Sequence, residues 1–337
     1  EASSLLNTPE YSVQSLLRKM NVEIVCTTDD PTDSLEHHQQ IQNQTLDTKI
    51  LPAFRPDKAI LIENQGFNDY IQKLAQAADM EIKSFADLLE ALQQRADFFD
   101  QMGCKLSDHG LEQVYAAEFT DAEADTIFKK KLGGQAISSA EATLYKSAML
   151  YHLGKLYHTK GWTQQFHLGA LRNNSARMMR QLGPDTGFDS IGDFDQASAL
   201  AKFLNRLDTE NALSKTILYN LNPRDNEVMA TMIGNFNDGS IKGKMQFGSA
   251  WWFLDQKDGM EKQLNALSNM GLLSCFIGML TDSRSFMSFP RHEYFRRLLC
   301  NLLGKDVHNG ELPNDIEWLG GLVQDICYRN AKQYFNF

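Results

Sequence analysis

The feature that most constrains this chain is an alternation of strand-like and helix-like segments along most of its 337 residues. Short apolar runs with the length of buried strands are separated by longer segments whose apolar residues recur at helical spacing. Glycine often stands just before such a run, where a helix ends in a left-handed conformation. The seven predicted strands span residues 21–27, 48–54, 104–107, 163–168, 215–220, 244–250 and 274–281.

Strands joined by helices run parallel, because the crossover helix carries the chain back to the end of the sheet where the previous strand began. Seven such units predict an α/β fold, a (β/α)8 TIM barrel with one unit missing, as a single domain over residues 1–337. A doubly wound open sheet is the alternative. It is less favoured because the sequence contains no Gly-x-Gly-x-x-Gly turn.

Several helix starts can be predicted from capping residues. Thr8 before Pro9 predicts one start, and Ser84 before a run of apolar residues predicts another. Ser138 with Glu141 three residues later has the pattern of a capping box. Each of these starts lies between two predicted strands or just before one, which fits the alternation.

Composition and charge narrow the functional classes. The formal net charge of −10 argues against bulk binding of nucleic acid, which requires a basic surface. No apolar run approaches the ~20 residues of a membrane-spanning helix. The five cysteines are odd in number and include no Cys-x-x-Cys pair, which is typical of reduced thiols. We therefore expect a cytoplasmic protein with no nucleic-acid or membrane partner.

Polar side chains recur where the predicted strands end. In a barrel of parallel strands the carboxyl ends meet at one rim, and that rim builds the active site. Taken alone, each residue has an ordinary explanation: an Asp after a strand, such as Asp57, is often a helix N-cap, and an Arg is often half of a surface ion pair. Their combination at one rim favours an enzyme. The candidate residues are Arg55 after the second run, Asp108 and His109 after the third, His167 in the fourth, Trp251 after the sixth, and Asp282 and Arg284 after the seventh.

Six segments together carry a resemblance to a known family. They are TTDDPTDSLEHH, FRPDKA, LSDHGLE, FHLGALRNNS, GSAWWF and GMLTDSRSFMSFPRHEYFRR, and the last is the most specific. With these segments the chain resembles the uronate isomerases of the amidohydrolase superfamily. The barrel of that family begins with a strand bearing a His-x-His motif, followed by a largely helical insertion. No His-x-His occurs in this sequence, so the resemblance implies that the predicted strands are the second to the eighth, that the first strand and the insertion are absent, and that the chain alone is inactive.

The resemblance implies an aldose–ketose isomerase that interconverts D-glucuronate and D-fructuronate, and D-galacturonate and D-tagaturonate. Such a reaction moves a proton between C2 and C1 through an enediol, which requires a base and stabilisation of a developing oxyanion. By resemblance, Asp282 is a carboxylate ligand of a divalent metal, expected to be zinc, with histidine ligands outside this chain. Asp282 is also a candidate for the base. Arg284 is a candidate for holding the sugar oxygens or stabilising the enediolate.

The remaining candidates are expected to bind the substrate. Arg55 suits a bidentate pair with the sugar-acid carboxylate. His167 is implied to hydrogen-bond the substrate, and Trp251 to cover a face of the sugar. His109 is expected either to contact the substrate or to support the metal from behind. The expected partner is a small anionic sugar acid, and the oligomeric state, including a homo-oligomer, is left open.

Two other functions stay open at this point. The first is a metal-dependent hydrolase on the same barrel, which often uses two metal ions bridged by a carboxylated lysine or a glutamate; Lys105 lies too early in its strand to serve well. The second is a non-enzymatic binding protein, for which an Asp282→Asn change would leave function intact. The recurrence of polar groups at one rim argues against the second.

Overall fold

The main sheet of the protein is parallel throughout. The computed structural model describes residues 2–44, 46–280, 282–283 and 285–337. Within these residues the sheet has six strands in the order β1-β2-β3-β4-β7-β8, and every neighbouring pair is parallel. Six of the seven predicted strands and the α/β class are confirmed. The strands are β1 (Ile24–Asp29), β2 (Lys49–Phe54), β3 (Leu106–Leu111), β4 (Thr163–Leu168), β7 (Thr216–Asn220) and β8 (Met245–Phe247), and a separate antiparallel pair comprises β5 (Ala170–Leu171) and β6 (Ser190–Ile191).

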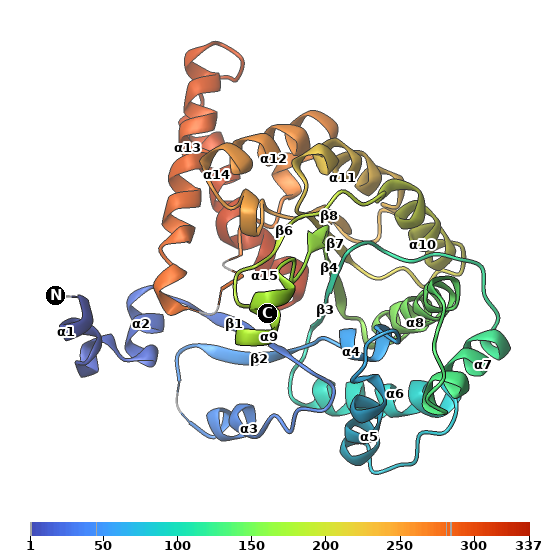
Figure 1. The fold of residues 1–337 in the computed structure, drawn as a ribbon. Helices are drawn as coiled ribbons and strands as arrows, with labels where there is room; N and C mark the ends of the chain where they lie inside the picture. Colours follow the sequence, from blue (N-terminus) through green and yellow to red (C-terminus); the bar gives the residue numbers. More distant parts are fainter. Residues whose placement is uncertain (1, 45, 281, 284) are drawn as a thin grey trace.

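Helices surround this sheet. They are α1 (Ala2–Leu6), α2 (Val13–Lys19), α3 (Glu36–Gln42), α4 (Asp57–Ile60), α5 (Phe67–Ala77), α6 (Phe85–Gln101), α7 (Asp121–Leu132), α8 (Ser139–Lys160), α9 (Ala176–Leu182), α10 (Ala197–Thr209), α11 (Asn226–Met232), α12 (Lys257–Met270), α13 (Arg291–His308), α14 (Ile316–Gln324) and α15 (Asn330–Phe335). Figure 1 shows α5 to α8 and α10 to α12 as an outer layer around the strands, while α1 projects to one side and α13 extends away from the body.

Capping residues start two long helices as predicted. Ser84 and Ser138 each accept the backbone N–H of the third helical residue, whose carboxylate accepts the N–H of the cap in return. The prediction at Thr8 is wrong. Its side chain makes no cap bond, only a 3-10 turn over Pro9–Tyr11 follows, and the hydroxyl of Ser12 caps α2 instead. Local capping chemistry thus decides the helix starts, and at the amino end it favours the later serine.

The prediction of a strand over residues 274–281 is wrong for 274–280, the part that the structure describes. A 3-10 turn opens this segment, and none of the described residues joins the sheet. Asn330 at the start of α15 donates to two of its carbonyls, at 2.9 and 2.8 Å, and Gln246 of β8 donates to a third at 3.0 Å. Because side-chain amides satisfy carbonyls that a neighbouring strand would otherwise bind, the apolar run packs beside the sheet without extending it.

The third strand begins later than predicted, at Leu106 rather than at residue 104. Gly103, with φ +88°, makes the left-handed turn after α6, and the chain enters the sheet only after that turn is complete. The shift places Asp108 and His109 inside the strand rather than after it. Because side chains alternate across a strand, these two neighbours point to opposite faces of the sheet.

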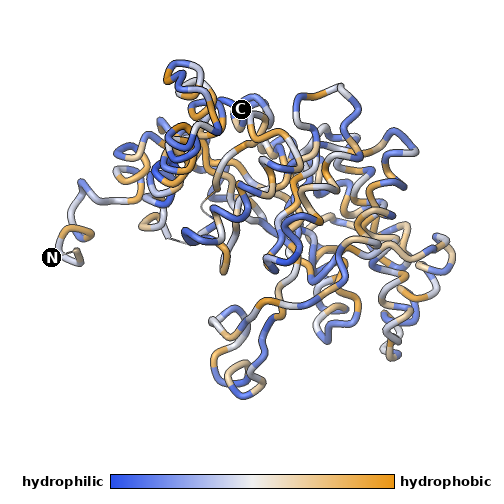
Figure 2. The backbone as a smooth tube through the Cα atoms, turned by 90° about the horizontal axis from the view of Figure 1, so that it is seen from above, coloured by the Kyte–Doolittle hydropathy of each residue, from blue (hydrophilic) through white to orange (hydrophobic). Residues whose placement is uncertain are grey.

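Two apolar clusters cover those two faces. The larger fills the layer between sheet and helices and includes Phe54 and Phe166. The smaller lies on the inner face and joins Ile217 and Tyr219 of β7 to Trp251. Figure 2 shows hydrophobic and hydrophilic stretches alternating along the helices, as expected where one side of each faces the sheet. None of the described helices is long and apolar enough to cross a membrane.

Candidate active site

A continuous chain of contacts joins five of the predicted site residues at the carboxyl end of the sheet. Arg55 Nη1 lies 3.2 Å from Asp108 Oδ2, and Asp108 Oδ1 lies 2.7 Å from His167 Nδ1. The ring of His167 meets the ring of Trp251 edge-on, with centroids 4.7 Å apart. Trp251 Nε1 in turn donates to Asp282 Oδ2. Residues from positions 55 to 282 therefore meet in one place. Arg284 lies outside the described residues.

His167 is the most constrained member of this chain of contacts. It lies on β4 and is buried, with 8% of its side chain exposed. Its ring stacks on Tyr219 of β7, with centroids 4.4 Å apart and planes within 2° of parallel. Nδ1 is held by Asp108, whereas Nε2 is buried and has no hydrogen-bond partner among the described residues. A buried polar atom without a partner is costly, so this nitrogen marks a place where a ligand atom would be favourable.

A second Asp–His pair lies on the other face of β3. Asp57 Oδ1 is 2.9 Å from His109 Nδ1, and Tyr157 OH of α8 is 3.0 Å from His109 Nε2. His109 is fully buried and stacks on Phe166 in the layer between sheet and helices. Both of its ring nitrogens are engaged, which leaves no donor or acceptor for a substrate. Of the two roles expected for His109, the geometry therefore favours support from behind.

Arg55 links the two Asp–His pairs. Its Nε lies 2.9 Å from Asp57 Oδ2, while Nη1 pairs with Asp108. The guanidinium lies against the backbone of Gly110, where an ideal Cβ would be 1.9 Å from Nη2. Glycine at this position is therefore required for the bridge as it stands. Because 30% of the Arg55 side chain remains exposed, the residue also faces the rim.

Both carboxylates of this network are held in their charged form. Burial opposes ionisation of Asp57, but hydrogen bonding to His109 and the charges of His109 and Arg55 outweigh it and lower its pKa well below the usual range. Burial likewise opposes ionisation of Asp108, and the charges of His167 and Arg55 lower its pKa on balance. Burial disfavours the charged guanidinium of Arg55, yet the two carboxylates raise its pKa further. The three groups form a buried network with charges fixed at neutral pH.

Sequence reasoning missed two members of this arrangement. Asp57 begins α4, as a helix cap would, but it makes no cap bond; its carboxylate instead binds Arg55, His109 and the backbone N–H of Gly110. Tyr219 lies within the predicted strand 215–220, where an aromatic residue is ordinary for a buried strand. Tyr219 stands opposite His167 in the register of β7 and β4. The alternation of side chains along β7 therefore indicates that both residues face the same side of the sheet.

The described residues do not by themselves form a metal centre. No group of three His, Cys, Asp or Glu side chains among them is arranged to hold a metal ion. Asp282 is exposed, with its Oδ2 bound by Trp251, and offers a single carboxylate ligand. Lys105 precedes β3 at the amino end of the sheet, far along the strand from the rim, so a bridging lysine for two metals has no support.

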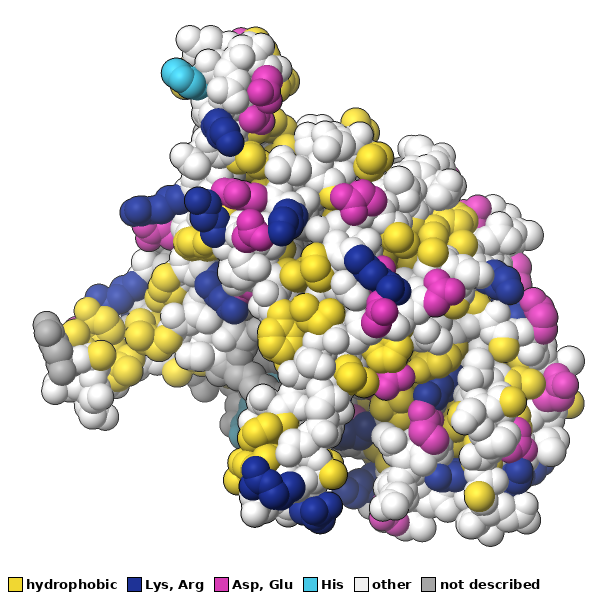
Figure 3. Space-filling model, turned by 45° about the horizontal axis from the view of Figure 1, so that its top comes forward, with side chains coloured by type: hydrophobic (Ala, Val, Ile, Leu, Met, Phe, Trp, Pro, Cys, Tyr) yellow, Lys and Arg dark blue, Asp and Glu magenta, His cyan; other side chains and the backbone are white. Residues whose placement is uncertain are grey.

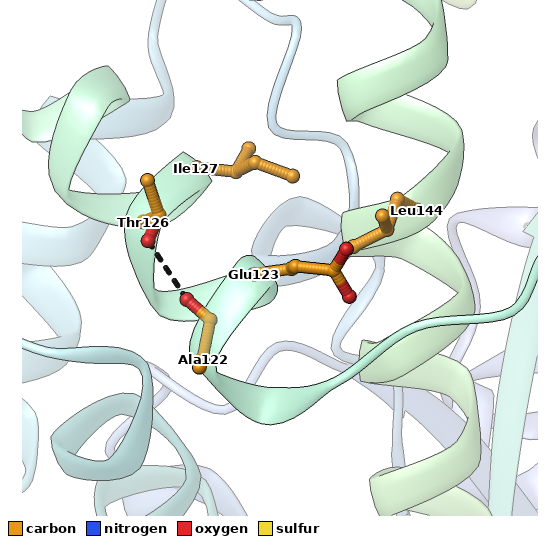
Figure 4. A pocket seen from close by; sticks show the side chains of 5 residues that line it. All are labelled: Ala122, Glu123, Thr126, Ile127 and Leu144. Carbon is orange, nitrogen blue, oxygen red and sulfur yellow. Dashed lines mark hydrogen bonds between the residues drawn. The ribbon is translucent and has the colours of Figure 1, made fainter.

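One surface hollow away from the rim lacks comparable chemistry. It lies between α7 and α8 and is lined by Ala122, Glu123, Thr126, Ile127 and Leu144 (Figure 4). Its one charged residue, Glu123, already accepts two bonds from the capping Thr120. This hollow therefore lacks the combination of carboxylate, imidazole, guanidinium and indole groups that meets at the rim.

Comparisons with known proteins show which proteins the chain is similar to. A family model described as glucuronate isomerase matches residues 1–335. A uronate isomerase of Flavobacterium johnsoniae is 63% identical over 337 residues, which cover 100% of this chain and 72% of that protein. The crystal structure of uronate isomerase from Thermotoga maritima is similar with a TM-score of 0.92 and 34% identity, over 99% of this chain and 72% of that one. A structure titled as a metal-dependent hydrolase from Lactobacillus casei has a TM-score of 0.58, 14% identity, and covers 95% of this chain and 75% of that one, which shows a shared fold alone.

Proposed function

The chain belongs to the glucuronate isomerase family, and from that premise we propose how its described residues divide the work of the enzyme. The protein is an aldose–ketose isomerase of uronates, such as D-glucuronate and D-fructuronate, and it has the α/β fold of its barrel-shaped relatives. The observation that carries the assignment of residues is the unbroken set of contacts from Arg55 through Asp108, His167 and Trp251 to Asp282.

Asp282 is the proposed base and metal ligand. Its carboxylate is exposed at the rim and is oriented by the Trp251 indole. Its backbone has φ +37°, a conformation that non-glycine residues rarely adopt, and such strain is often found at active sites. A carboxylate at this point can take the C2 proton of an open-chain sugar and return it to C1. Arg284, two residues on, remains the proposed partner of the oxyanion.

Two arginines at the rim are suited to the substrate carboxylate. Arg55 already pairs with Asp57 and Asp108, so its grip on a substrate would use the exposed part of its guanidinium. Arg172, which directly follows β5, lies over the Trp252 ring at 5.2 Å and reaches the same glycine, its Nη2 being 3.7 Å from an ideal Cβ on Gly110. The two negative charges of Asp57 and Asp108 weaken the attraction of Arg55 for a substrate carboxylate. This favours a role shared between Arg55 and Arg172.

A divalent metal, proposed to be zinc, would be held by Asp282 together with ligands outside the described residues. The exposed carboxylate of Asp282 at the rim is a ligand type that divalent ions accept, and this supports a metal ion there. A bound cation would polarise the sugar carbonyl or hydroxyl next to it. Two described residues offer atoms of a type that binds such an ion. They are His167, whose Nε2 has no hydrogen-bond partner among the described residues, and Asp282, whose carboxylate is exposed.

The proposed partner is a small sugar acid, taken up at the rim. On the face shown in Figure 3, acidic and basic side chains are interspersed rather than gathered into one basic area, which supports the absence of a nucleic-acid partner. All five cysteines are free thiols, which supports a cytoplasmic location. A homo-oligomer is neither required nor opposed by these features.

The test is an assay of the protein expressed from its complete gene. Incubation with D-glucuronate is expected to give the ketose, and Asp282→Asn is expected to lower kcat by about 10²–10⁴ because it removes the general base. A substitution of similar chemistry on the surface, Asp258→Asn in α12, serves as the control and is expected to be as active as the parent. Turnover of an amide or ester substrate with two tightly bound metal ions per chain, and none of the sugar acid, would favour the hydrolase instead.

A further inference from the structure

We propose that a cavity between α8 and α10 is a second binding site, separate from the rim, for a small molecule that carries an oxyanion and hydroxyl groups. The cavity measures about 430 Å³, within the ~300–1,000 Å³ that is typical of small-molecule sites. Its walls are one side of α10, part of α8, and the segment 115–119 that follows β3. Figure 1 shows α8 and α10 in the outer helical layer. The isomerase reaction uses none of these residues.

One side of α10 supplies the polar wall of the cavity. Its residues recur at spacings of three and four and therefore share a face of the helix; they are Lys202, Asn205, Arg206 and Thr209. Within the described residues, neither Lys202 nor Arg206 forms an ion pair or donates a hydrogen bond. Two like charges four residues apart on a helix destabilise it. An anion bound between them would remove that repulsion.

The Arg206 guanidinium is held in place by two aromatic rings. Its Cζ lies 4.1 Å from the ring centroid of Phe119 and 4.4 Å from that of Tyr151, and these two centroids are 5.6 Å apart. The guanidinium therefore lies in the corner between two tilted rings, and both attract its charge. Because the rings offer no oxygen acceptors, its N–H groups remain available for a ligand. A planar donor group that is already fixed loses little freedom when it binds a carboxylate or a phosphate.

Two carboxylates also line the cavity, and they differ in their surroundings. Glu210 is already paired: the Tyr151 hydroxyl lies 2.6 and 2.7 Å from its two oxygens, and Lys155 Nζ lies 2.9 Å from Oε2. Glu118 is exposed and has no partner among the described residues. With Glu210 offset by Lys155, two cations face one carboxylate, which leaves an excess of one positive charge. This excess favours an anion over a cation.

The remaining lining indicates what else the ligand carries. Asn205 and Thr209 are exposed on α10 beside the two cations, and their amide and hydroxyl groups can bind hydroxyls. The segment that follows β3 contributes the side chains of Tyr115, Ala116 and Ala117, which present carbon atoms for C–H groups. Sugar acids and sugar phosphates both combine an oxyanion with hydroxyl and C–H groups. The shared chemistry is an oxyanion on a small polyol.

The experiment is calorimetric titration of the protein expressed from its complete gene, at about 20 mM salt to limit screening. The probes are D-gluconate, D-glucose 6-phosphate and the uncharged D-glucitol. We expect one or both anions to bind and D-glucitol not to bind. The tighter anion distinguishes a carboxylate from a phosphate as the group recognised. Binding of neither anion, or equal binding of D-glucitol, would overturn the proposal.

Two arginine variants test the location and the role of charge. Arg206→Gln is expected to weaken the anion about 10- to 100-fold, because it removes a charge-assisted pair of hydrogen bonds. Arg297→Gln, on α13, removes the same charge from a surface ion pair with Glu293 and is expected to match the parent. Equal weakening in both variants would show that only net charge matters. In Arg55→Met, the binding event that Arg206→Gln removes should persist; its loss there, with retention in Arg206→Gln, would place the anion at the rim and refute the second site.

Two further variants separate binding from folding. The side chains of Lys202 and Glu118 are exposed and without partners among the described residues, so their replacement should leave the unfolding midpoint unchanged. Lys202→Gln should weaken the anion about threefold, and Glu118→Gln should strengthen it by a similar factor. A change of the same sign in both variants, or none in either, would contradict the proposal. None of these readouts depends on turnover, so an inactive parent protein would refute the isomerase function and leave this site standing.

Discussion

Replacing Gly110 with alanine tests whether Arg55 is locked between its two carboxylates. The new Cβ would lie 1.9 Å from Nη2 and 3.1 Å from Cζ of Arg55. An ordinary contact needs about 3.4 Å, so the guanidinium has to move by roughly 1.5 Å. Its hydrogen bonds to Asp57 and Asp108, at 2.9 and 3.2 Å, cannot both survive such a shift. Were the Arg55 side chain unrestrained, the same displacement would cost little, because a long flexible side chain can turn aside.

The expected cost follows from the two ion pairs. A hydrogen bond to a charged group contributes about 1.5–3 kcal/mol. Because 30% of the Arg55 side chain is exposed, solvent screening reduces that value, and alanine recovers about 0.5–1 kcal/mol over glycine within a strand. We therefore expect Gly110→Ala to lower the free energy of unfolding by about 2–4 kcal/mol.

The assay is urea unfolding of the parent and the variant, followed by fluorescence. Gly304→Ala is the matched control: this glycine lies inside α13, no atom lies within 4 Å of an ideal Cβ, and alanine there should stabilise the helix by up to about 1 kcal/mol. In an Arg55→Met background, Gly110→Ala should cost much less, since the charged bridge is already gone. A Gly110→Ala variant as stable as the parent, or equally destabilised in both backgrounds, would refute the account of Arg55 as a bridge.

Three more outcomes can be measured on the same protein. Asp57→Asn should reduce the pH dependence of stability, because the pKa of Asp57 is lowered in the folded protein. The contribution of Asp57 is complete above the unfolded pKa near 4 and is lost as the pH falls toward the folded pKa, so the unfolding midpoints of parent and variant should begin to approach each other below about pH 4. Parallel curves down to pH 2 would contradict this. Tyr219→Phe keeps the ring stacked on His167 and should retain most activity, whereas Tyr219→Leu should lose at least about tenfold in kcat, and equal activity of the two would show that the stacking is irrelevant. Ser138→Ala should lower the free energy of unfolding by about 1 kcal/mol through loss of the capping box of α8, without a change in KM, and an unchanged unfolding midpoint would show that this cap contributes nothing.

The two Asp–His pairs on β3 show how one strand can serve structure and chemistry together. Asp108 and His109 are adjacent in β3, yet each belongs to a different pair on a different face of the sheet. The outer pair is buried under α8 and anchors Arg55 through Asp57. The inner pair lies beside the aromatic rings at the rim, and its Nε2 has no hydrogen-bond partner within the described part of the chain. The charged Asp57 on the outer face thus holds Arg55, and Arg55 holds the Asp108 carboxylate that orients the His167 ring.

Local patterns in the sequence determined the fold class and much of the element order. The buried parallel strand β7 is a near-continuous apolar run, and capping residues such as Ser84 and Ser138 act within a single turn, so neighbouring residues suffice to predict them. The gathering of polar residues at the carboxyl rim also followed, because parallel strands bring their ends to one side.

Only the tertiary structure decided which of those residues face one another. The start of β3 set the parity that sends Asp108 inward and His109 outward, and a shift of one residue would have exchanged them. Whether residues 274–280 joined the sheet depended on amides from Asn330 and Gln246, which are distant in sequence. Asp57 looks like a helix cap in sequence and becomes an ion-pair partner because β3 lies beside it. These outcomes depend on contacts between segments far apart in the chain, and such contacts leave no signature in the residues around any one of them.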